Sequence, residues 1–181
     1  MEAPEVPTEH LHEHIHEQAH GSGGKIRWVM GVAMTSALLA AMAAVASLMA
    51  GHHSNEAMIE QIKSSDQWGY YQAKGVKAAV LGSKLELLEG LEKTVSPKDK
   101  EKIAEYAKQQ QEIKEKAEEL EKTADHHLHT HLIFARSVTL FQVAIAIAAI
   151  SVLVHKRQFW FVSIGFGAVG LVFLLLGFFK P

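Results

Sequence analysis

The sequence predicts an all-α membrane protein with three transmembrane helices and a long antiparallel helical hairpin, of the coiled-coil type, between the first and second spans. Three apolar stretches, at residues 28–51, 132–154 and 159–179, are each long enough as helices to cross a hydrocarbon core of about 30 Å. The block between the first two stretches is charged and rich in Ala, Leu, Glu, Lys and Gln, which favours helix over strand. We therefore expect one intramembrane unit and one extramembrane unit.

The composition shifts along the chain place the segment boundaries. They predict a His- and Glu-rich tail (1–24), a first transmembrane helix (25–51), an extramembrane hairpin (52–131), a second transmembrane helix (132–154), a short basic loop (155–158) and a third transmembrane helix (159–179).

The N-terminal tail is the first candidate metal-binding segment. Its histidines alternate with glutamates, and on a helix several pairs would lie four residues apart on one face, the spacing at which two imidazoles chelate one divalent ion. Imidazole and carboxylate ligands favour zinc, nickel or copper. The alternative is an acidic tail whose histidines titrate without binding a metal. The residues concerned are His10, His12, His14, His16 and His20.

The basic residues around the spans predict the orientation. The tight connection at residues 155–157 contains Lys156 and Arg157, and short basic loops remain cytoplasmic. Lys25 and Arg27, directly before the first span, agree with a cytoplasmic N-terminus. The chain has no cysteine, which suits either side of a bacterial inner membrane. We expect a multi-pass inner-membrane protein with a periplasmic or extracellular hairpin.

Heptad spacing in the hairpin predicts how its two helices pack. Ser96 and Pro97 provide a cap and a first helical residue for the second helix. Leucines beyond what two helices can bury predict self-association. The row predicted in the second helix is Ile103, Tyr106, Gln110, Ile113, Ala117, Leu120 and Ala124; the facing row is Ala73, Val76, Val80, Ser83, Leu87 and Gly90, widened by Leu81, Leu85 and Leu88.

An aromatic box on the first hairpin helix is the candidate interaction site. Tryptophan and tyrosine beside amide side chains are typical of binding hot spots, so the box is suited to another subunit, a protein or peptide partner, or a glycan. The alternative is that it packs within the hairpin or its oligomer. The box residues are Asp66, Gln67, Trp68, Tyr70, Tyr71, Gln72 and Lys74.

This box, placed after one span and before a helical hairpin and two further spans, resembles an uncharacterised family of bacterial inner-membrane proteins known only as a domain of unknown function. The resemblance covers nearly the whole chain. It implies an α-helical bacterial membrane protein, and it brings no established activity and no catalytic residues.

A second histidine cluster lies where the hairpin meets the spans. Its two halves end the first span and precede the second, so topology places them at the same membrane face. His127 and His131, four residues apart, could bind a divalent metal with His53 as third ligand. The alternative is a set of interfacial histidines or a pH-sensitive collar. The cluster contains His52, His53, His126, His127, His129 and His131.

Small residues in the spans predict close helix packing. Ala33, Ala37 and Ala41 repeat every four residues, and Ser163 with Gly167 extends the pattern to the third span. No acidic residue lies inside any of the three spans, which argues against a proton-coupled transporter.

Together these features favour a non-enzymatic integral membrane protein, a homo-oligomeric scaffold or interaction protein that presents a helical stalk. Membrane lipid is an expected partner and nucleic acid is not. A glycine-rich phosphate loop, a nucleophile elbow and a zinc-protease motif are all missing from the sequence. The alternative is a divalent-metal-handling or channel component that uses the interfacial histidines.

Overall fold

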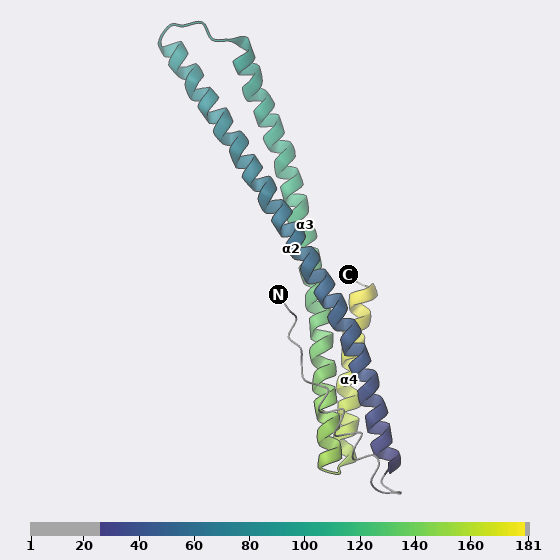
Figure 1. Cartoon of the computed structure of the whole chain (residues 1–181). Helices are drawn as coiled ribbons and strands as arrows, with labels where there is room; N and C mark the ends of the chain where they lie inside the picture. The colour runs from purple at the N-terminus through teal and green to yellow at the C-terminus, as the bar shows by residue number, and fades with distance from the viewer. Residues whose placement is uncertain (1–25, 180–181) are drawn as a thin grey trace. The chain divides into compact units, whose positions relative to one another are not determined.

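The structure, a computed structural model, describes residues 26–179. This part of the chain is helical throughout apart from two connections, and its helices are α2 (Ile26–Gly90), α3 (Pro97–Leu153) and α4 (Arg157–Phe179) (Figure 1). No strand occurs between residues 26 and 179, so the all-α prediction is confirmed. Each of the three helices contains a stretch long and apolar enough to cross a membrane.

The two connections end their helices in the same way. After α2, the amide of Lys93 donates to the carbonyl of Leu88 and Glu92 adopts a positive φ of 54°. After α3, the amide of Lys156 donates to the carbonyl of Ser151, and His155 has a φ of 57°. Both are Schellman motifs built without the usual glycine. As the sequence predicts, α3 starts at Pro97.

The contacts divide the chain into two compact units. We call Met1–Ser54 with His127–Pro181 the three-helix unit, and Asn55–His126 the two-helix unit. The boundary falls close to the limits of the predicted hairpin, 52–131, although neither α2 nor α3 is interrupted there.

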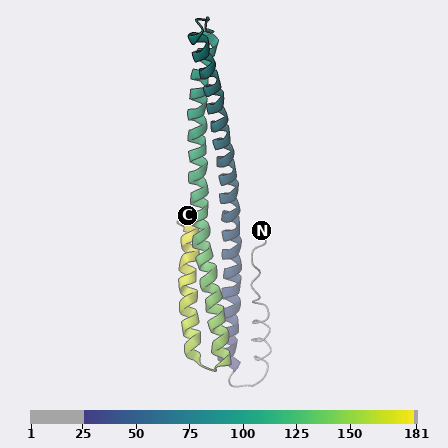
Figure 2. The ribbon, with the colours of Figure 1, turned by 90° about the vertical axis from the view of Figure 1, so that its left-hand side faces the viewer.

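In the three-helix unit, α4 lies beside α3 (Figure 2), and it packs on both α2 and α3 through its smallest residues. A Cβ on Gly167 would lie 2.7 Å from Leu39 of α2, and one on Gly177 would lie 2.7 Å from the ring of Phe134 of α3. The helix therefore approaches closely only because these positions have no side chain. The predicted small pair of Ser163 and Gly167 is buried in this contact.

Serine hydroxyls reinforce these contacts. Ser163 Oγ of α4 donates to the carbonyl of Ala144 at 2.8 Å, and Ser137 Oγ of α3 donates to that of Gly170 at 2.8 Å. Bonds of this kind contribute about 0.6 kcal/mol each between helices in a bilayer.

The predicted alanine row of α2 does not pack within the chain. Ala37 and Ala41 are exposed and Ala33 is only half-buried. A neighbouring face of α2 is buried instead, in the core that it forms with α3 and α4. That buried face consists of Val32, Ser36, Leu39, Ala43, Ala46 and Ala50.

In the two-helix unit, the predicted row of α3 is correct. The predicted row of α2 is wrong, although the leucines predicted to widen it, Leu81, Leu85 and Leu88, do pack inward. Every member of the α3 row is buried or half-buried, led by Ala117 and Ile113. Every member of the predicted α2 row, from Ala73 to Gly90, is exposed. The face of α2 that packs contains larger aromatic and leucine side chains: Ser64, Trp68, Tyr71, Gly75, Ala78, Leu81, Leu85 and Leu88.

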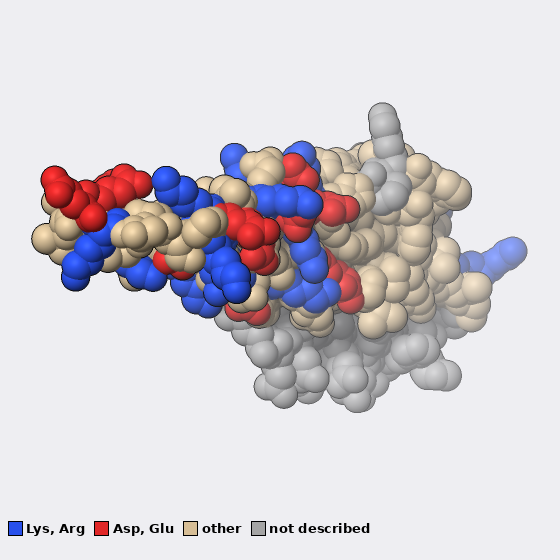
Figure 3. All heavy atoms as spheres, turned by 90° about the horizontal axis from the view of Figure 1, so that it is seen from above, with Lys and Arg blue, Asp and Glu red and all other residues tan. Residues whose placement is uncertain are grey.

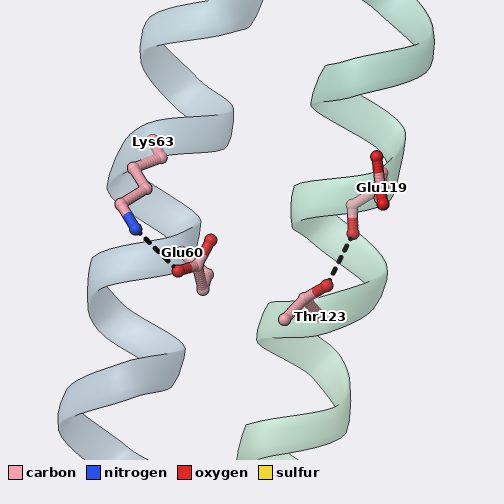
Figure 4. Close-up of polar contacts among 4 residues, drawn as sticks. All are labelled: Glu60, Lys63, Glu119 and Thr123. Atoms are coloured by element: carbon pink, nitrogen blue, oxygen red, sulfur yellow. Dashed lines mark hydrogen bonds and ion pairs between the residues drawn. The ribbon is translucent and has the colours of Figure 1, made fainter.

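Charged side chains of both signs are interspersed over one part of the surface, and uncharged side chains cover most of the rest in the view of Figure 3. Ion pairs between α2 and α3 in the two-helix unit join Lys84 to Asp99 at 2.7 Å and Lys100 to Glu89 at 3.3 Å. Some polar contacts are local to one helix, such as Lys63 to Glu60 and the Thr123 hydroxyl to the Glu119 carbonyl (Figure 4). Such exposed contacts stabilise the fold weakly.

Candidate functional site

The aromatic box lies in the α2 part of the two-helix unit, and its two largest inward side chains contact each other. The rings of Trp68 and Tyr71 meet edge to face, with centroids 5.6 Å apart. Trp68 Nε1 donates a hydrogen bond of 3.1 Å to the Glu121 carboxylate of α3. Both rings are half-buried. These contacts pair α2 with α3 within this unit.

A polar contact follows one turn further along α2. Gln110 of α3 donates from Nε2 to the backbone carbonyl of Tyr71 at 3.2 Å. A Cβ on Gly75 would lie 2.8 Å from that nitrogen, so the glycine makes room for the amide. A polar group within an apolar heptad row fixes the alignment of the two helices, because any shift leaves the amide without this acceptor.

Lys74 links the box to α3 by a different interaction. Its ammonium nitrogen lies 5.3 Å from the ring centroid of Tyr70 and 5.3 Å from that of Tyr106. Cation–π contacts at partly exposed sites contribute on the order of 0.5–1 kcal/mol each. Lys74 is thereby held at the side of the two-helix unit, with the Tyr70 ring 56% exposed beside it.

The box thus has an inner and an outer part. Asp66, Tyr70 and Gln72 are exposed, while Gln67 and Lys74 are intermediate. An external partner would therefore meet a phenol, a carboxylate and an amide, since the indole is directed into the helix pair. Sequence reasoning did not find the α3 partners of the box. The only signal for them was Gln110, a polar residue within a heptad row.

The histidines of the three-helix unit are only partly brought together. His53 Nδ1 and His127 Nδ1 are 3.0 Å apart, and the His53 ring stacks on Phe134 with an interplanar angle of 11°. His131 instead directs its Nδ1 to the carbonyl of Ala50 at 2.8 Å. Because a carbonyl oxygen accepts, the His131 ring donates in this bond. The three imidazoles predicted as a ligand set are therefore engaged in two separate contacts.

His52 also contacts this pair, since its ring lies edge-on to that of His53 with centroids 5.3 Å apart. His52 and His129 are exposed in the three-helix unit, and His126 is exposed in the two-helix unit. Between residues 26 and 179, no three His, Cys, Asp or Glu side chains are grouped so that they could hold a metal ion. The tail histidines, from His10 to His20, lie outside the residues that the structure describes.

These features define a class of protein: an all-helical chain with three long apolar helices of membrane-span length. The chain belongs to the family described as Domain of unknown function (DUF4337), which matches residues 28–180. The match covers α2, α3 and α4, including the aromatic box. Neither a curated protein nor a solved structure matches the chain significantly.

Proposed function

We propose that this protein is a non-enzymatic, homo-oligomeric scaffold of a bacterial inner membrane, which presents an antiparallel coiled-coil hairpin outside the bilayer. The observation that carries the proposal is the continuity of α2 and α3. Each passes, without interruption of the helix, from an apolar span-length stretch into a charged heptad segment. A hairpin arm of residues 55–90 would be about 54 Å long at the usual helical rise, a suitable length for a stalk.

The outward-facing side chains of the three-helix unit support insertion in lipid. Most of the large apolar residues of α4 are exposed, including Phe161 at 65% and Phe179 at 83%. Water would make such a surface unfavourable, whereas acyl chains accommodate it. We therefore propose that the exposed apolar side chains of the three-helix unit contact membrane lipid.

The contact between Arg157 and Trp28 supports the proposed orientation. The guanidinium carbon lies 5.8 Å from the indole ring centroid, so a basic and an aromatic residue meet where α4 begins. Trp and Arg together are typical of a membrane interface, and short basic loops favour the cytoplasmic side. The hairpin is then periplasmic or extracellular. Labelling of a single introduced cysteine, Gln111→Cys, from outside intact cells tests this; protection of that thiol would reverse the orientation.

Native mass spectrometry of the full chain, released from nanodiscs, tests the oligomer. The protein would be purified without a metal-affinity column so that bound metal is retained. A discrete oligomer supports the scaffold, and a monomer at all concentrations contradicts it. The same spectrum examines the second candidate function, because a stoichiometric zinc-sized mass increment would indicate metal handling.

The close approach of His53 and His127 favours that second candidate. These two Nδ1 atoms, 3.0 Å apart, would provide two of the four ligands of a tetrahedral zinc site, and further ligands would come from another copy or from the tail. The variant His53→Ala/His127→Ala should then lose one metal equivalent, whereas His52→Ala should not. Equal metal content in all three proteins would exclude this pair as ligands.

A further inference from the structure

The α2 helix of the two-helix unit has a second apolar face, opposite the one that packs on α3. Its residues recur at alternating steps of three and four, and all are exposed. Val76, Val80 and Leu87 are its large side chains, at 63–66% exposure. We name this face the outer row: Ala73, Val76, Val80, Ser83, Leu87 and Gly90.

The apolar exposure is confined to one helix of the pair. In the two-helix unit, the exposed large apolar side chains belong to α2 or, for Leu91, directly follow its last residue, and α3 contributes none between residues 97 and 126. Lipid does not explain this, since the outer row is bordered by charged residues such as Lys77 and Glu86. A regular apolar row with a 3.5-residue period matches the surface of another helix.

The charges on the two edges of the outer row favour the same helix of a second copy in parallel orientation. In the heptad, Lys77 and Lys84 occupy one edge, while the opposite edge has Gln72, Ala79 and Glu86. Parallel pairing places the lysine edge of each helix against the non-basic edge of the other. Antiparallel pairing would place lysines against lysines, which is unfavourable.

Insertion of both copies in one bilayer also favours the parallel arrangement of their α2 helices. Copies that share a membrane orientation are related by an axis normal to the bilayer, so their α2 helices run parallel and equivalent residues meet. Ala73, Ser83 and Gly90 then allow the backbones to approach around the valine and leucine contacts. The row is only about 27 Å long at the helical rise. Confinement to the same membrane compensates by raising the effective concentration of the second copy.

We propose that the outer row is the seam at which a second copy of this chain binds, parallel and in register, α2 against α2. This inference rests on the homo-oligomer proposed above. It assigns the contact to Val76, Val80 and Leu87, and it leaves the inner part of the aromatic box to the pairing of α2 with α3 within each copy.

Disulfide cross-linking in membranes tests the seam directly, because the natural chain has no cysteine. The single variants would be Val76→Cys, Val80→Cys and Leu87→Cys, with Lys116→Cys on an exposed position of α3 as control. Under mild oxidation we expect each seam variant to form covalent dimers at least about ten times faster than the control, since the seam holds equivalent residues together.

Leu87→Cys distinguishes the two orientations. In an antiparallel pair centred between Lys77 and Lys84, the two copies of residue 87 would be about 20 Å apart at the usual helical rise, too far for a disulfide. Rapid cross-linking at residue 87 therefore supports the parallel register. Cross-linking at residue 80 without cross-linking at residues 76 and 87 would overturn it.

Native mass spectrometry of Val80→Asp separates this inference from the proposed function. A charge at this exposed position leaves the contacts between α2 and α3 intact, so we expect the oligomer to dissociate while Lys116→Asp remains assembled. An oligomer that survives Val80→Asp and forms no seam disulfides would overturn the seam while retaining the scaffold. A monomeric natural chain would overturn both.

Discussion

The two units of this protein pack their helices by different means. In the three-helix unit, Gly167, Gly170 and Gly177 bring α4 against its neighbours, and serine hydroxyls donate to backbone carbonyls. In the two-helix unit, Trp68 and Leu85 fill the contact. The difference is the one expected if, as proposed, lipid surrounds the three-helix unit and water surrounds the two-helix unit. Lipid supplies no hydrophobic drive, so close backbone approach must stabilise the contact, whereas in water the burial of large apolar side chains does.

The same comparison gives exposed apolar residues two meanings. Phe161 of α4 and Val80 of α2 are almost equally exposed, at 65% and 66%. Against lipid, an exposed phenylalanine is in a favourable environment. In water, an exposed valine within a heptad row signals a contact still to be made. Exposure therefore points to a partner only in the two-helix unit.

The largest predicted effect removes the close approach of α4. In Gly170→Val the new Cβ would lie 2.9 Å from the Phe141 ring and 3.3 Å from Leu140 Cβ. Because Phe141 is fully buried, its ring cannot easily move away from the new side chain. We expect a loss of about 2–3 kcal/mol in the free energy of unfolding, the usual cost of overpacking. Thermal unfolding in nanodiscs would measure it.

Gly165→Val is the matched control for that prediction. It introduces the same side chain in the same helix, but its Cβ would meet nothing within 4 Å. We expect its unfolding temperature to stay near that of the natural chain. Equal losses for both variants would mean that the close approach at residue 170 is not the cause, since valine has a higher helix propensity than glycine and propensity alone would give no loss.

The second prediction concerns the hydrogen bond from Trp68 of α2 to Glu121 of α3 in the two-helix unit. A double-mutant cycle with Trp68→Phe and Glu121→Ala should give a coupling energy of about 1.5 kcal/mol, because the indole donates to a carboxylate in a half-buried site. Urea unfolding followed by circular dichroism would measure it. The same cycle with Glu119→Ala, an exposed neighbour, should give a coupling near zero. Similar coupling energies in the two cycles would mean that the hydrogen bond between Trp68 and Glu121 does not account for the coupling.

Much of the fold could be predicted from the sequence because it depends on local signals. The apolar lengths gave the span-like helices, Pro97 gave the start of α3, and one heptad row gave its buried face. The buried face of α2 could not be chosen in this way. This helix has two apolar rows, and period alone does not say which one meets α3. The choice depends on the sizes of Trp68 and Leu85 and on the fit of Gln110 against Gly75.

The candidate sites were harder to predict for the same reason. The sequence places the box on one helix, yet the direction of each side chain depends on the face that α3 covers. Topology correctly brought His53 near His127. It could not anticipate that His131 bonds to the Ala50 carbonyl, because the ring position depends on the spacing of the two helices.

The third prediction tests how much that histidine contact contributes to the three-helix unit. His53→Ala removes the hydrogen bond to His127 and the stacking on Phe134, so we expect a loss of about 1 kcal/mol. His52→Ala removes only the edge contact of an exposed ring with His53, so it should change the stability less. Thermal unfolding in nanodiscs compares the two. Equal effects would show that the pair adds nothing beyond helix propensity.

The smallest predicted effect is a gain, at the connection of the two-helix unit. Glu92 has a φ of 54°, a conformation that costs a side-chain-bearing residue about 1 kcal/mol. Glu92→Gly relieves this strain, and the greater freedom of glycine in the unfolded chain offsets part of the gain. We expect a net increase of about 0.5 kcal/mol in the free energy of unfolding, because the strain relieved in the folded chain exceeds the entropy that glycine adds to the unfolded chain. Hydrogen exchange of residues 85–110 should slow accordingly. The control Lys116→Gly, within a helix, should instead lower the free energy of unfolding by about 1 kcal/mol. If Glu92→Gly also lowers it, the backbone at the end of α2 is not strained.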